Sequence, residues 1–569
     1  MTAEGTGINL RMNIKGATGL NRFKAYISLA IVLAVAMMST SWFYVRSVPT
    51  GAPPDELAHL GYVADVATGH HLIPDYRHSE ILESRQPNYL NHPPLYYSAE
   101  GLVGRILHWD PIINVARYRA LSTLWVALGI FLWVLICGRL GLGLLHTIAA
   151  VGACMAIPMF TYLAGAVNND DMCYLGIALF FYGFVLFQHR QRVSAYVMAL
   201  GLVVTMLTKA TGSLFLLTFL ISWGALSWPQ LRTALLNIHI RISVAAVALI
   251  CCAYYLPTLV IYHTPFPHPG NLLRPPMPAD PAMSFIRYTR IFIETMFSYL
   301  PLILSHKSFE PVTGALKVAF YLMLALPLLA WLGWRVGAKA SWQRVMADAY
   351  MIALLVTVAA NLWVSWQGYW QVGQFTGVQP RYFAFALPGL FAMGFMENYR
   401  FKIRNTILLI FATIAAFLAL HKPSLSAIEH MRGDQQRFTE LHWSSVEENS
   451  SIPFTKLTSG ISTQIAGNLD KVAIKEHEAR LQGWAIDVSS KQPARDVMVS
   501  VHGHLLGTIH PGSSRPDVVQ VLDSPNARYA GFTAMIDGLP DNVKPCDITV
   551  QALQDDGSLA PISNINCAP

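Results

Sequence analysis

Two adjacent carboxylates, Asp55 and Glu56, are the side chains in this sequence best placed to do chemistry. They follow the rigid pair Pro53-Pro54, about ten residues after the first long apolar segment. A carboxylate in a stiffened loop can act as a general base or hold a metal ion. The simpler interpretation is that Asp55 caps a helix predicted over 56–68. The two interpretations are compatible, and the other polar motifs of the chain favour chemistry.

A second motif combines one histidine, two prolines and two tyrosines. It is His92-Pro93-Pro94-Leu95-Tyr96-Tyr97. The two prolines interrupt any preceding helix and fix the direction in which the neighbouring side chains point. Such a loop can present a binding surface, or it can be a structural loop whose tyrosines lie at a lipid interface.

Three more polar segments lie at the ends of apolar stretches of the chain. Asn169 and Asp170 begin one apolar stretch, Lys209 lies between two others, and Arg381 precedes Tyr382 at the start of a fourth. Each has a plain alternative, since a carboxylate can cap a helix, a lysine can extend to the membrane surface, and an arginine can mark a boundary. Together they offer cations suited to a phosphate and carboxylates beside them.

The composition predicts an integral membrane protein that positions these residues. Of the 569 residues, 53% are hydrophobic and only 13% are charged, and the mean hydropathy is +0.40. Soluble proteins of this size do not have that balance. The net charge of +7 reflects the loops, because no basic run is interleaved with aromatic residues as in nucleic-acid-binding proteins.

Apolar segments of about 20 residues predict eleven membrane spans. The candidates are 25–45, 118–138, 143–165, 172–188, 193–207, 210–227, 242–263, 312–334, 348–366, 382–398 and 405–421. The segment 284–304 is apolar but carries Arg287, Arg290 and Glu294, and it is interpreted as a helix lying on the membrane surface.

Lysines and arginines predict which loops face the cytoplasm. Arg11, Lys15, Arg22 and Lys24 precede the first span, so the N-terminus is expected inside. Eleven spans then place the segments 46–117, 264–311 and 422–569 outside, together with the short loop 367–381. Every motif described above lies on that outer side.

The chain is expected to divide into four parts. Residues 1–24 are a cytoplasmic tail, 25–421 a transmembrane domain with outside loops 46–117 and 264–311, and 422–469 a linker. Residues 470–569 show the period-two pattern of strands and predict an all-β sandwich in the periplasm.

Two features of this C-terminal domain carry their own expectations. Cys546 and Cys567 are its only cysteines, and an oxidising compartment favours a disulfide between them. Trp484 is interpreted as a buried core residue, with carbohydrate binding as the alternative.

The ordered set of motifs resembles the multi-span GT-C class of glycosyltransferases, and most closely the bacterial membrane family labelled DUF2142. The motifs that carry the resemblance over residues 25–421 are Pro54-Asp55-Glu56 with His59, His92-Pro93-Pro94-Leu95-Tyr96-Tyr97, Asn169-Asp170, Leu207-Thr208-Lys209 with Thr211-Gly212, and Gln379-Pro380-Arg381-Tyr382 with Pro388. The resemblance implies a GT-C-like fold and transfer of a sugar from a polyprenyl phosphate, with inversion, outside the cytoplasm.

The resemblance also implies roles for individual residues. Asp55 corresponds to the catalytic base of the class, with Glu56 beside it as a second catalytic carboxylate that orients the loop or binds a metal. Lys209 and Arg381 would lie near the lipid phosphate. The remaining substrate-binding residues would be His59, His92, Tyr96, Tyr97, Asn169, Asp170 and Tyr382. The chain departs from related aminoarabinose and mannose transferases at His92, where a basic residue often precedes the two prolines. No cofactor is identified, and a divalent metal is left open.

We therefore expect a polyprenyl-phosphate-sugar-dependent inverting glycosyltransferase in the bacterial inner membrane. Its partners would be a polyprenyl-phosphate-linked sugar as donor and a cell-envelope glycan or lipid-linked glycan as acceptor. The alternative is a transporter or flippase of a lipid-linked sugar. Transporters more often have interrupted helices, charges near the middle of the bilayer and two related halves. Here the charges gather at one face, which favours the enzyme.

Overall fold

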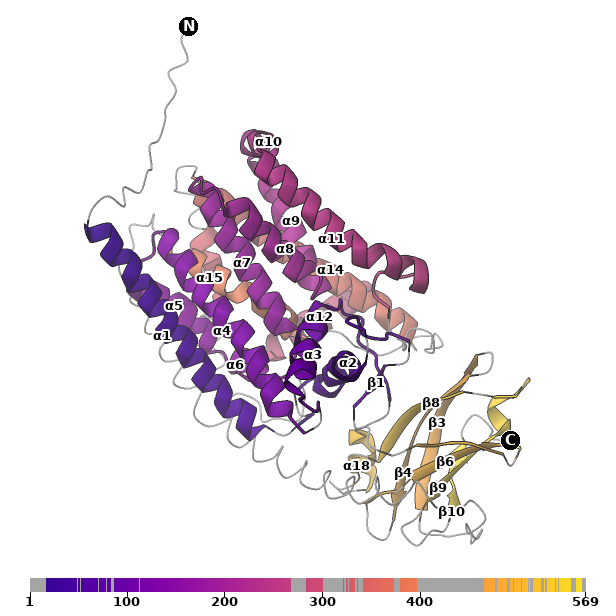
Figure 1. The fold of residues 1–569 in the computed structure, drawn as a ribbon. Helices are drawn as coiled ribbons and strands as arrows, with labels where there is room; N and C mark the ends of the chain where they lie inside the picture. Colours follow the sequence, from indigo (N-terminus) through magenta and orange to yellow (C-terminus); the bar gives the residue numbers. More distant parts are fainter. Residues whose placement is uncertain are drawn as a thin grey trace.

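The computed structural model describes a helical unit within residues 17–396 and a strand-rich domain within 465–564. The longest stretches outside the described residues are 1–16, 268–282, 300–320 and 397–464. Figure 1 shows the helical unit as a bundle whose first helix starts near the N-terminus, with the strand-rich domain beyond its opposite end.

The helical unit is built from helices of very unequal length. They are α1 (Ala17–Ser47), α2 (Glu56–Thr68), α3 (Leu95–Leu107), α4 (Val115–Arg139), α5 (Leu144–Met155), α6 (Pro158–Leu163), α7 (Asp170–Gln188), α8 (Ser194–Met206), α9 (Ala210–Leu226), α10 (Trp228–Leu235), α11 (Ile238–Tyr262), α12 (Phe285–Tyr299), α14 (Trp342–Val372), the 3₁₀ helix η2 (Pro380–Ala386) and α15 (Leu387–Phe395). The first helix starts at Ala17, inside the predicted tail 1–24.

Five described helices are long and apolar enough to cross a membrane. They are α1, α4, α7, α11 and α14, and the bent pair α9–α10 raises the number to six if it counts as one span. The predicted number of eleven is therefore not confirmed. Two of the predicted spans, 405–421 and most of 312–334, lie outside the described residues.

Prolines lie at two breaks of the helical unit, one inside a predicted span and one just after another. The segment 143–165 is divided into α5 and α6, because Pro158 begins a new helix and Ile157 before it is extended. The segment 210–227 forms α9, but the chain then bends by 108° into α10, which has a proline in its first turn. The segments 193–207 and 382–398 form only the short helices α8 and α15, the latter preceded by η2.

The centre of the bundle is held by close helix contacts and by aromatic packing. Helices α7 and α8 approach each other where glycines face the neighbouring backbone: a Cβ atom on Gly183 would lie 2.5 Å from the amide nitrogen of Met198. Phe181 of α7 packs against Phe219 of α9 and Tyr350 of α14, with ring centroids 4.8 and 5.2 Å apart. This core fixes the relative positions of the helix ends that carry the polar motifs.

Helices α2 and α3 form a separate layer at the end of the bundle opposite the start of α1 (Figure 1). A short hairpin of β1 (Glu80–Ile81) and β2 (Gln86–Pro87) precedes α3. The layer has its own apolar core, which includes Tyr62, Tyr97 and Tyr118. The backbone N–H of Leu95 donates to the carbonyl of Leu207 at 2.9 Å, and this bond ties α3 to the loop between α8 and α9.

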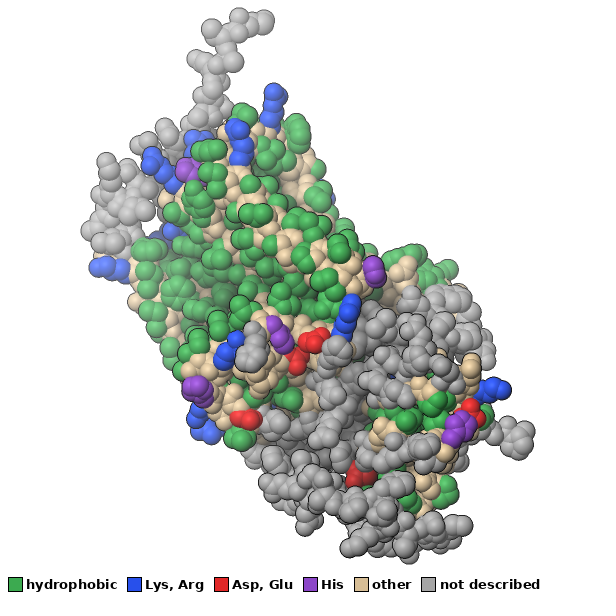
Figure 2. Space-filling view, turned by 45° about the vertical axis from the view of Figure 1, so that its right-hand side comes forward, with side chains coloured by type: hydrophobic (Ala, Val, Ile, Leu, Met, Phe, Trp, Pro, Cys, Tyr) green, Lys and Arg blue, Asp and Glu red, His purple; other side chains and the backbone are tan. Residues whose placement is uncertain are grey.

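The surface of the helical unit has the distribution of a membrane protein. Figure 2 shows hydrophobic side chains over its middle, with several Lys and Arg side chains at its upper end and Lys, Arg, Asp, Glu and His side chains mixed toward its lower end. The basic loops after α4, after α7 and around α10 lie toward the upper end in Figure 1. This agrees with one charged face predicted from Lys and Arg, and the polar motifs lie at the other end.

The C-terminal domain contains two β-sheets. Its strands are β3 (Ile465–Lys475), β4 (Glu478–Asp487), β5 (Gln492–Pro493), β6 (Asp496–Val501), β7 (His504–Ile509), β8 (Gly531–Asp537), β9 (Ile548–Leu553), β10 (Leu559–Pro561) and β11 (Ser563–Asn564). One sheet has the order β10-β9-β6-β7; in the other, β11-β3-β4-β5, strand β8 also pairs with β4. Alternating side chains from both sheets, including Leu481 and Val499, share one apolar core, as expected for a sandwich.

The structure bears on the expected role of Trp484, but it leaves the expected disulfide between Cys546 and Cys567 untested. Trp484 is partly buried and packs against a small cluster around Ile486 and Val518, the latter in the short helix α18 (Pro516–Leu522). This favours the core role over carbohydrate binding. Cys546 is disulfide-bonded; Cys567 lies outside the described residues, so their pairing stays a prediction.

Candidate active site at the outer end of the helical bundle

Asp55 occupies the N-cap position of α2 without capping it. The residue has a left-handed backbone (φ 62°), and its side chain makes no capping hydrogen bond. The carboxylate instead accepts hydrogen bonds from Arg381, whose guanidinium forms an ion pair with Oδ2, and from Tyr89, whose hydroxyl lies 2.5 Å from Oδ1. The capping role predicted for this side chain is therefore wrong. The left-handed turn aims the carboxylate away from its own helix and toward other segments.

The surroundings of Asp55 keep its carboxylate ionised. Burial alone would raise its pKa, but the charge of Arg381, the hydrogen bond from Tyr89 and the proximity of His59 outweigh that effect and hold the pKa well below the usual range. Arg381 also donates from Nη1 to the carbonyl of Pro54 at 3.2 Å, so it holds both the side chain and the backbone of the turn. The side chain of Asp55 remains 26% exposed.

A second ion pair lies close to the first. Lys209, which precedes α9, places its Nζ 2.5 Å from Oδ1 of Asp170 at the start of α7, and both side chains are nearly buried. Capping of α7 by an acidic side chain is not seen, because Asn169 holds the N-cap position and makes no side-chain cap bond. The ring of Tyr382 lies 5.3 Å from Lys209 Nζ and 5.4 Å from the Arg381 guanidinium carbon, so one aromatic ring contacts both cations.

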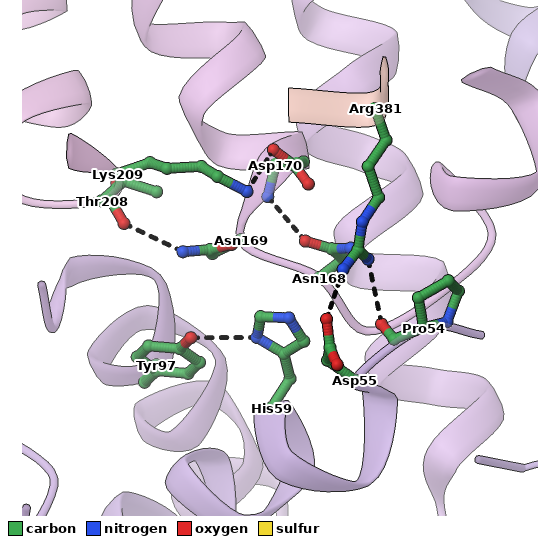
Figure 3. Close-up of polar contacts among 10 residues, drawn as sticks. All are labelled: Pro54, Asp55, His59, Tyr97, Asn168, Asn169, Asp170, Thr208, Lys209 and Arg381. Atoms are coloured by element: carbon green, nitrogen blue, oxygen red, sulfur yellow. Dashed lines mark hydrogen bonds and ion pairs between the residues drawn. The ribbon is translucent and has the colours of Figure 1, made fainter. Parts of the chain in front are cut away.

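Backbone-directed hydrogen bonds hold the polar loops around these ion pairs (Figure 3). Asn169 donates from Nδ2 to the carbonyl of Thr208 at 3.0 Å, which joins the loop before α7 to the loop before α9. Asn168 accepts from the backbone N–H of Asp170 at 2.9 Å. The predicted residues Asp55, Asn169, Asp170, Lys209 and Arg381 therefore meet in one place, although they come from four separate segments.

The two histidines form the floor of this site as neutral rings. His59 stacks on His92 and on Tyr97, with ring centroids 5.9 and 5.8 Å apart, and its Nδ1 lies 2.9 Å from the Tyr97 hydroxyl. Burial lowers the pKa of His59 to about 3, against the opposing effect of Asp55. Burial, reinforced by Lys209, also holds the pKa of His92 well below its usual value. Neither ring carries a charge near neutral pH, so a phosphate contact by a protonated His92 is not favoured.

The two tyrosines of the proline motif are core residues of the layer, not aromatic anchors at a lipid interface. Tyr96 and Tyr97 are fully buried. The hydroxyl of Tyr96 lies 2.7 Å from that of Ser122 in α4, and Tyr97 bonds to His59. Behind Tyr96, Glu100 accepts from the indole of Trp125 at 2.9 Å, and burial raises the pKa of its carboxyl.

Glu56 has different surroundings from its neighbour Asp55. It is buried and forms a two-point ion pair with Arg119 of α4, with N–O distances of 2.7 and 2.6 Å. Its carboxylate also accepts from the backbone N–H groups of Gly51 and Val167. Arg119 in turn donates to the carbonyls of Val45 and Val48 at the end of α1. Both oxygens of Glu56 are thus occupied, which favours a positioning role for this residue over a catalytic one.

The described residues do not form a metal site. Within them, no three His, Cys, Asp or Glu side chains come together in an arrangement that could hold a metal ion. The carboxylate of Glu56, considered from the sequence as a metal ligand, has protein donors on both oxygens. Its surroundings therefore do not fit the metal that the sequence left open.

Several buried polar atoms at the site have no protein partner. Among the described residues, these atoms include Asn168 Nδ2, Asn169 Oδ1, Asp170 Oδ2, Asp171 Oδ2, Thr208 Oγ1, Thr211 Oγ1 and Arg381 Nε. Buried polar atoms in native proteins nearly always have a partner, so a group of them implies a polar ligand or water. The unused donors of Asn168 and Arg381 suit an anion, and the unused oxygens of Asn169 and Asp170 suit hydroxyl groups.

Sequence reasoning missed three residues that shape the site. Arg119 carried a usable signal, because an arginine at the start of an apolar span requires a partner. Asn168 directly precedes the motif Asn169-Asp170, but its unused donor depends on the local fold. Tyr89 lies next to a recognised motif, yet only the three-dimensional structure brings its hydroxyl to Asp55.

Comparisons with known proteins give a distant structural likeness. No family model matches the sequence, so membership of DUF2142 is not confirmed, and no curated protein matches. Among solved structures, the chain is similar to ArnT from Cupriavidus metallidurans bound to undecaprenyl phosphate, with a TM-score of 0.45 and 16% identity over 72% of this chain and 69% of that chain. The apo state of the same protein gives a TM-score of 0.30 and 14% identity over 64% of this chain and 77% of that one. At these values the likeness identifies neither a substrate nor a catalytic residue in this chain.

Proposed function

We propose that this protein is an inverting glycosyltransferase of the bacterial inner membrane. It takes a sugar from a polyprenyl-phosphate carrier and passes it to a hydroxyl group of a cell-envelope glycan at the outer face. The observation that carries the proposal is the meeting of an ionised, partly exposed Asp55 with two buried cations and unused buried donors. One site then offers a base, a place for a phosphate and acceptors for sugar hydroxyls.

The proposed reaction uses each part of the site once. Asp55 removes the proton from the acceptor hydroxyl while its oxygen attacks the anomeric carbon. The bond from that carbon to the phosphate oxygen breaks, and polyprenyl phosphate leaves with the bonding electron pair. Lys209 and Arg381 stabilise the charge that develops on the leaving phosphate. Attack opposite the leaving group inverts the anomeric carbon.

The donors near the two cations support this assignment of the phosphate. Lys209 uses one of its three N–H bonds on Asp170, and Arg381 leaves Nε unused. Asn168 adds an unused amide N–H. A phosphodiester could therefore accept three hydrogen bonds here without breaking either ion pair. Tyr382, in contact with both cations, would hold them side by side.

Glu56 is proposed as a positioning residue. With Arg119 it ties the end of α1, the turn before α2, α4 and the loop before α7 into one unit. The neighbouring Asp55 inherits that fixed position. The neutral rings of His59 and His92, which form the floor of the site, would contact the sugar, since uncharged aromatic surfaces suit sugar rings.

The transporter alternative is less well supported. A carrier for a lipid-linked sugar would place its polar groups near the middle of the membrane, often at interrupted helices. The Lys209–Asp170 pair instead lies where α9 and α7 begin, and the Arg381–Asp55 pair lies where η2 and α2 begin. The bend between α9 and α10 is at the opposite end of α9.

Reconstituted transfer tests the proposal. The purified protein is placed in vesicles with a panel of polyprenyl-phosphate monosaccharides, and release of polyprenyl phosphate is followed with and without an added glycan acceptor. We expect release with at least one donor, and inversion at the anomeric carbon of the product. Movement of intact donor across the bilayer without any release of polyprenyl phosphate would instead identify a transporter.

A further inference from the structure

Both oxygens of Asp55 are occupied in this structure, although a general base must accept a hydrogen bond from the acceptor. Oδ2 is taken by Arg381, the cation assigned to the donor phosphate, and Oδ1 by the hydroxyl of Tyr89 at 2.5 Å. A reacting hydroxyl must lie within about 2.6–3.2 Å of its base. The phenol oxygen of Tyr89 therefore lies where an acceptor hydroxyl would lie.

The backbone around Tyr89 is fixed on both sides. Asn88 is fully buried and donates from Nδ2 to the carbonyl of Ala58 at 2.7 Å. Leu90 is also buried, and its carbonyl accepts from the hydroxyl of Tyr62 at 2.6 Å. Tyr89, between them, is 41% exposed. Of these three consecutive residues, only Tyr89 has an exposed side chain, and its hydroxyl contacts Asp55.

A fixed backbone and an exposed ring leave side-chain rotation as the available movement. Rotation of Tyr89 breaks its bond to Asp55 but does not disturb Asn88 or Leu90. Exposed side chains change rotamer within picoseconds to nanoseconds. Rotation of Tyr89 thus frees Oδ1 of Asp55 at a small cost in free energy. Oδ2 is not freed in this way, because its partner Arg381 is buried.

We propose that Tyr89 occupies the acceptor-hydroxyl position of the empty enzyme and leaves it when the acceptor binds, an inference that rests on the proposed function. The acceptor then enters from the exposed side of Asp55, past Tyr89, whereas the phosphate of the donor lies on the Arg381 side. One O–H···O hydrogen bond to Oδ1 is exchanged for another of the same kind. The ligand class is a molecule with a free hydroxyl group, such as a sugar.

The variant Tyr89→Phe tests this exchange, because it keeps the ring and removes only the competing hydroxyl. The probe is methyl α-glucopyranoside as surrogate acceptor, with the donor that supports release in the vesicle assay held at saturation. The KM for the glucoside is expected to fall about ten-fold, the lower range for losing a hydrogen bond to a charged group, while kcat stays within about two-fold. Hydrolysis of the donor by water, the smallest hydroxyl, is expected to rise.

A matched control separates this effect from the loss of any phenol. Tyr196 is 47% exposed, and its hydroxyl lies 2.7 Å from a ring nitrogen of His239, at the other end of the bundle. Tyr196→Phe is expected to leave the KM for the glucoside unchanged. An unchanged KM in Tyr89→Phe, or a fall in kcat at unchanged KM, would overturn the exchange and show that Tyr89 only orients Asp55. Movement of intact donor by the wild-type protein, without release of polyprenyl phosphate, would overturn the proposed function itself, which keeps the two failures distinct.

Discussion

Asp55 and Glu56 are neighbours in sequence, each paired with an arginine, yet they differ in burial and in their other hydrogen-bond partners. Glu56 is buried, bound at two points by Arg119 and supplied with two backbone N–H groups. Asp55 is partly exposed, its Oδ1 accepts a hydrogen bond from the exposed Tyr89, and unused polar atoms lie around its arginine. A fully satisfied ion pair stabilises a fold, whereas one with spare capacity can bind and react. The difference assigns structure to Glu56 and chemistry to Asp55.

Replacing Asp55 is expected to have the largest effect on activity. Asp55→Asn keeps the size of the side chain and removes its basicity. Loss of a general base typically slows a reaction by about 100- to 10,000-fold. The measurement is release of polyprenyl phosphate by purified variant in vesicles, with thermal unfolding to confirm the fold. Near wild-type transfer by a folded Asp55→Asn protein would contradict the assignment of the base.

Replacing Glu56 is expected to act on stability instead. Glu56→Ala leaves Arg119 buried without its carboxylate, and removing one partner of a buried pair costs about 3–5 kcal/mol. Unfolding in detergent should show this loss, and the loss should exceed that of Asp55→Asn, which keeps an oxygen acceptor for Arg381 at a side chain that is 26% exposed. Asp517→Ala in the C-terminal domain is the matched control, because the Asp517 side chain is 63% exposed and a pair with an exposed carboxylate is worth about 0–1 kcal/mol. A stable but inactive Glu56→Ala protein would reverse the roles of the two carboxylates.

How much of this contrast the sequence could predict depends on how far apart along the chain the contacting residues are. Apolar runs predict α1, α4, α7, α11 and α14 well, since each is a continuous helix with local hydrogen bonds. Helices that cross in alternate directions bring every second loop to one face, which is why the ordered motifs predicted a single site. The break at Pro158 divides the predicted span 143–165 into two short helices, because an apolar composition alone does not reveal a bend.

The partners of the two carboxylates were beyond sequence reasoning. Arg381 is 326 residues from Asp55, and Arg119 is 63 residues from Glu56. Nothing in a motif states which carboxylate will meet which arginine, so both were assigned to catalysis. The left-handed turn at Asp55 is likewise a consequence of the surrounding fold, and it converted an expected cap into a side chain aimed at the site.

Replacing the guanidinium of Arg381 by the amine of a lysine should have a smaller effect on activity than removing the base. Arg381→Lys keeps the positive charge but cannot donate at once to Asp55, to the carbonyl of Pro54 and, through Nε, to a phosphate. We expect the KM for the donor to rise by about ten-fold, the cost of one hydrogen bond to a charged group. Lys209→Ala should act in the same direction.

The control for this pair of variants is Arg241→Lys, at the other end of the bundle, where the arginine donates to the carbonyl of Leu236. Its donor KM should stay at the wild-type value. If Lys209→Ala and Arg381→Lys also keep that value, both cations are boundary residues, and the phosphate binds elsewhere.

The smallest expected effect is a pH dependence of stability that comes from His59. Because burial lowers its pKa from the usual 6.5 to about 3, the unfolded chain binds a proton between these values that the folded protein does not. The contribution of neutral His59 to the free energy of unfolding is therefore complete above about pH 6.5. It is lost as the pH falls, by at most about 1.4 kcal/mol per pH unit for one group. His92 acts in the same direction, and Asp55 adds to the loss only below about pH 4, where its unfolded form takes up a proton. Glu100, whose pKa burial raises, has the opposite sign.

Comparing two proteins isolates His59 from these other groups. His59→Gln keeps a polar partner for Tyr97 but does not titrate, while Glu100 contributes equally to variant and wild type and Asp55 titrates only below the pH range used. Unfolding in detergent at pH 7.0, 6.0 and 5.0 should therefore show the wild type losing stability faster than the variant on acidification. Equal slopes would mean that His59 is protonated in the folded protein. A charged imidazole would then face Asp55, and the floor of the site could contact the phosphate directly.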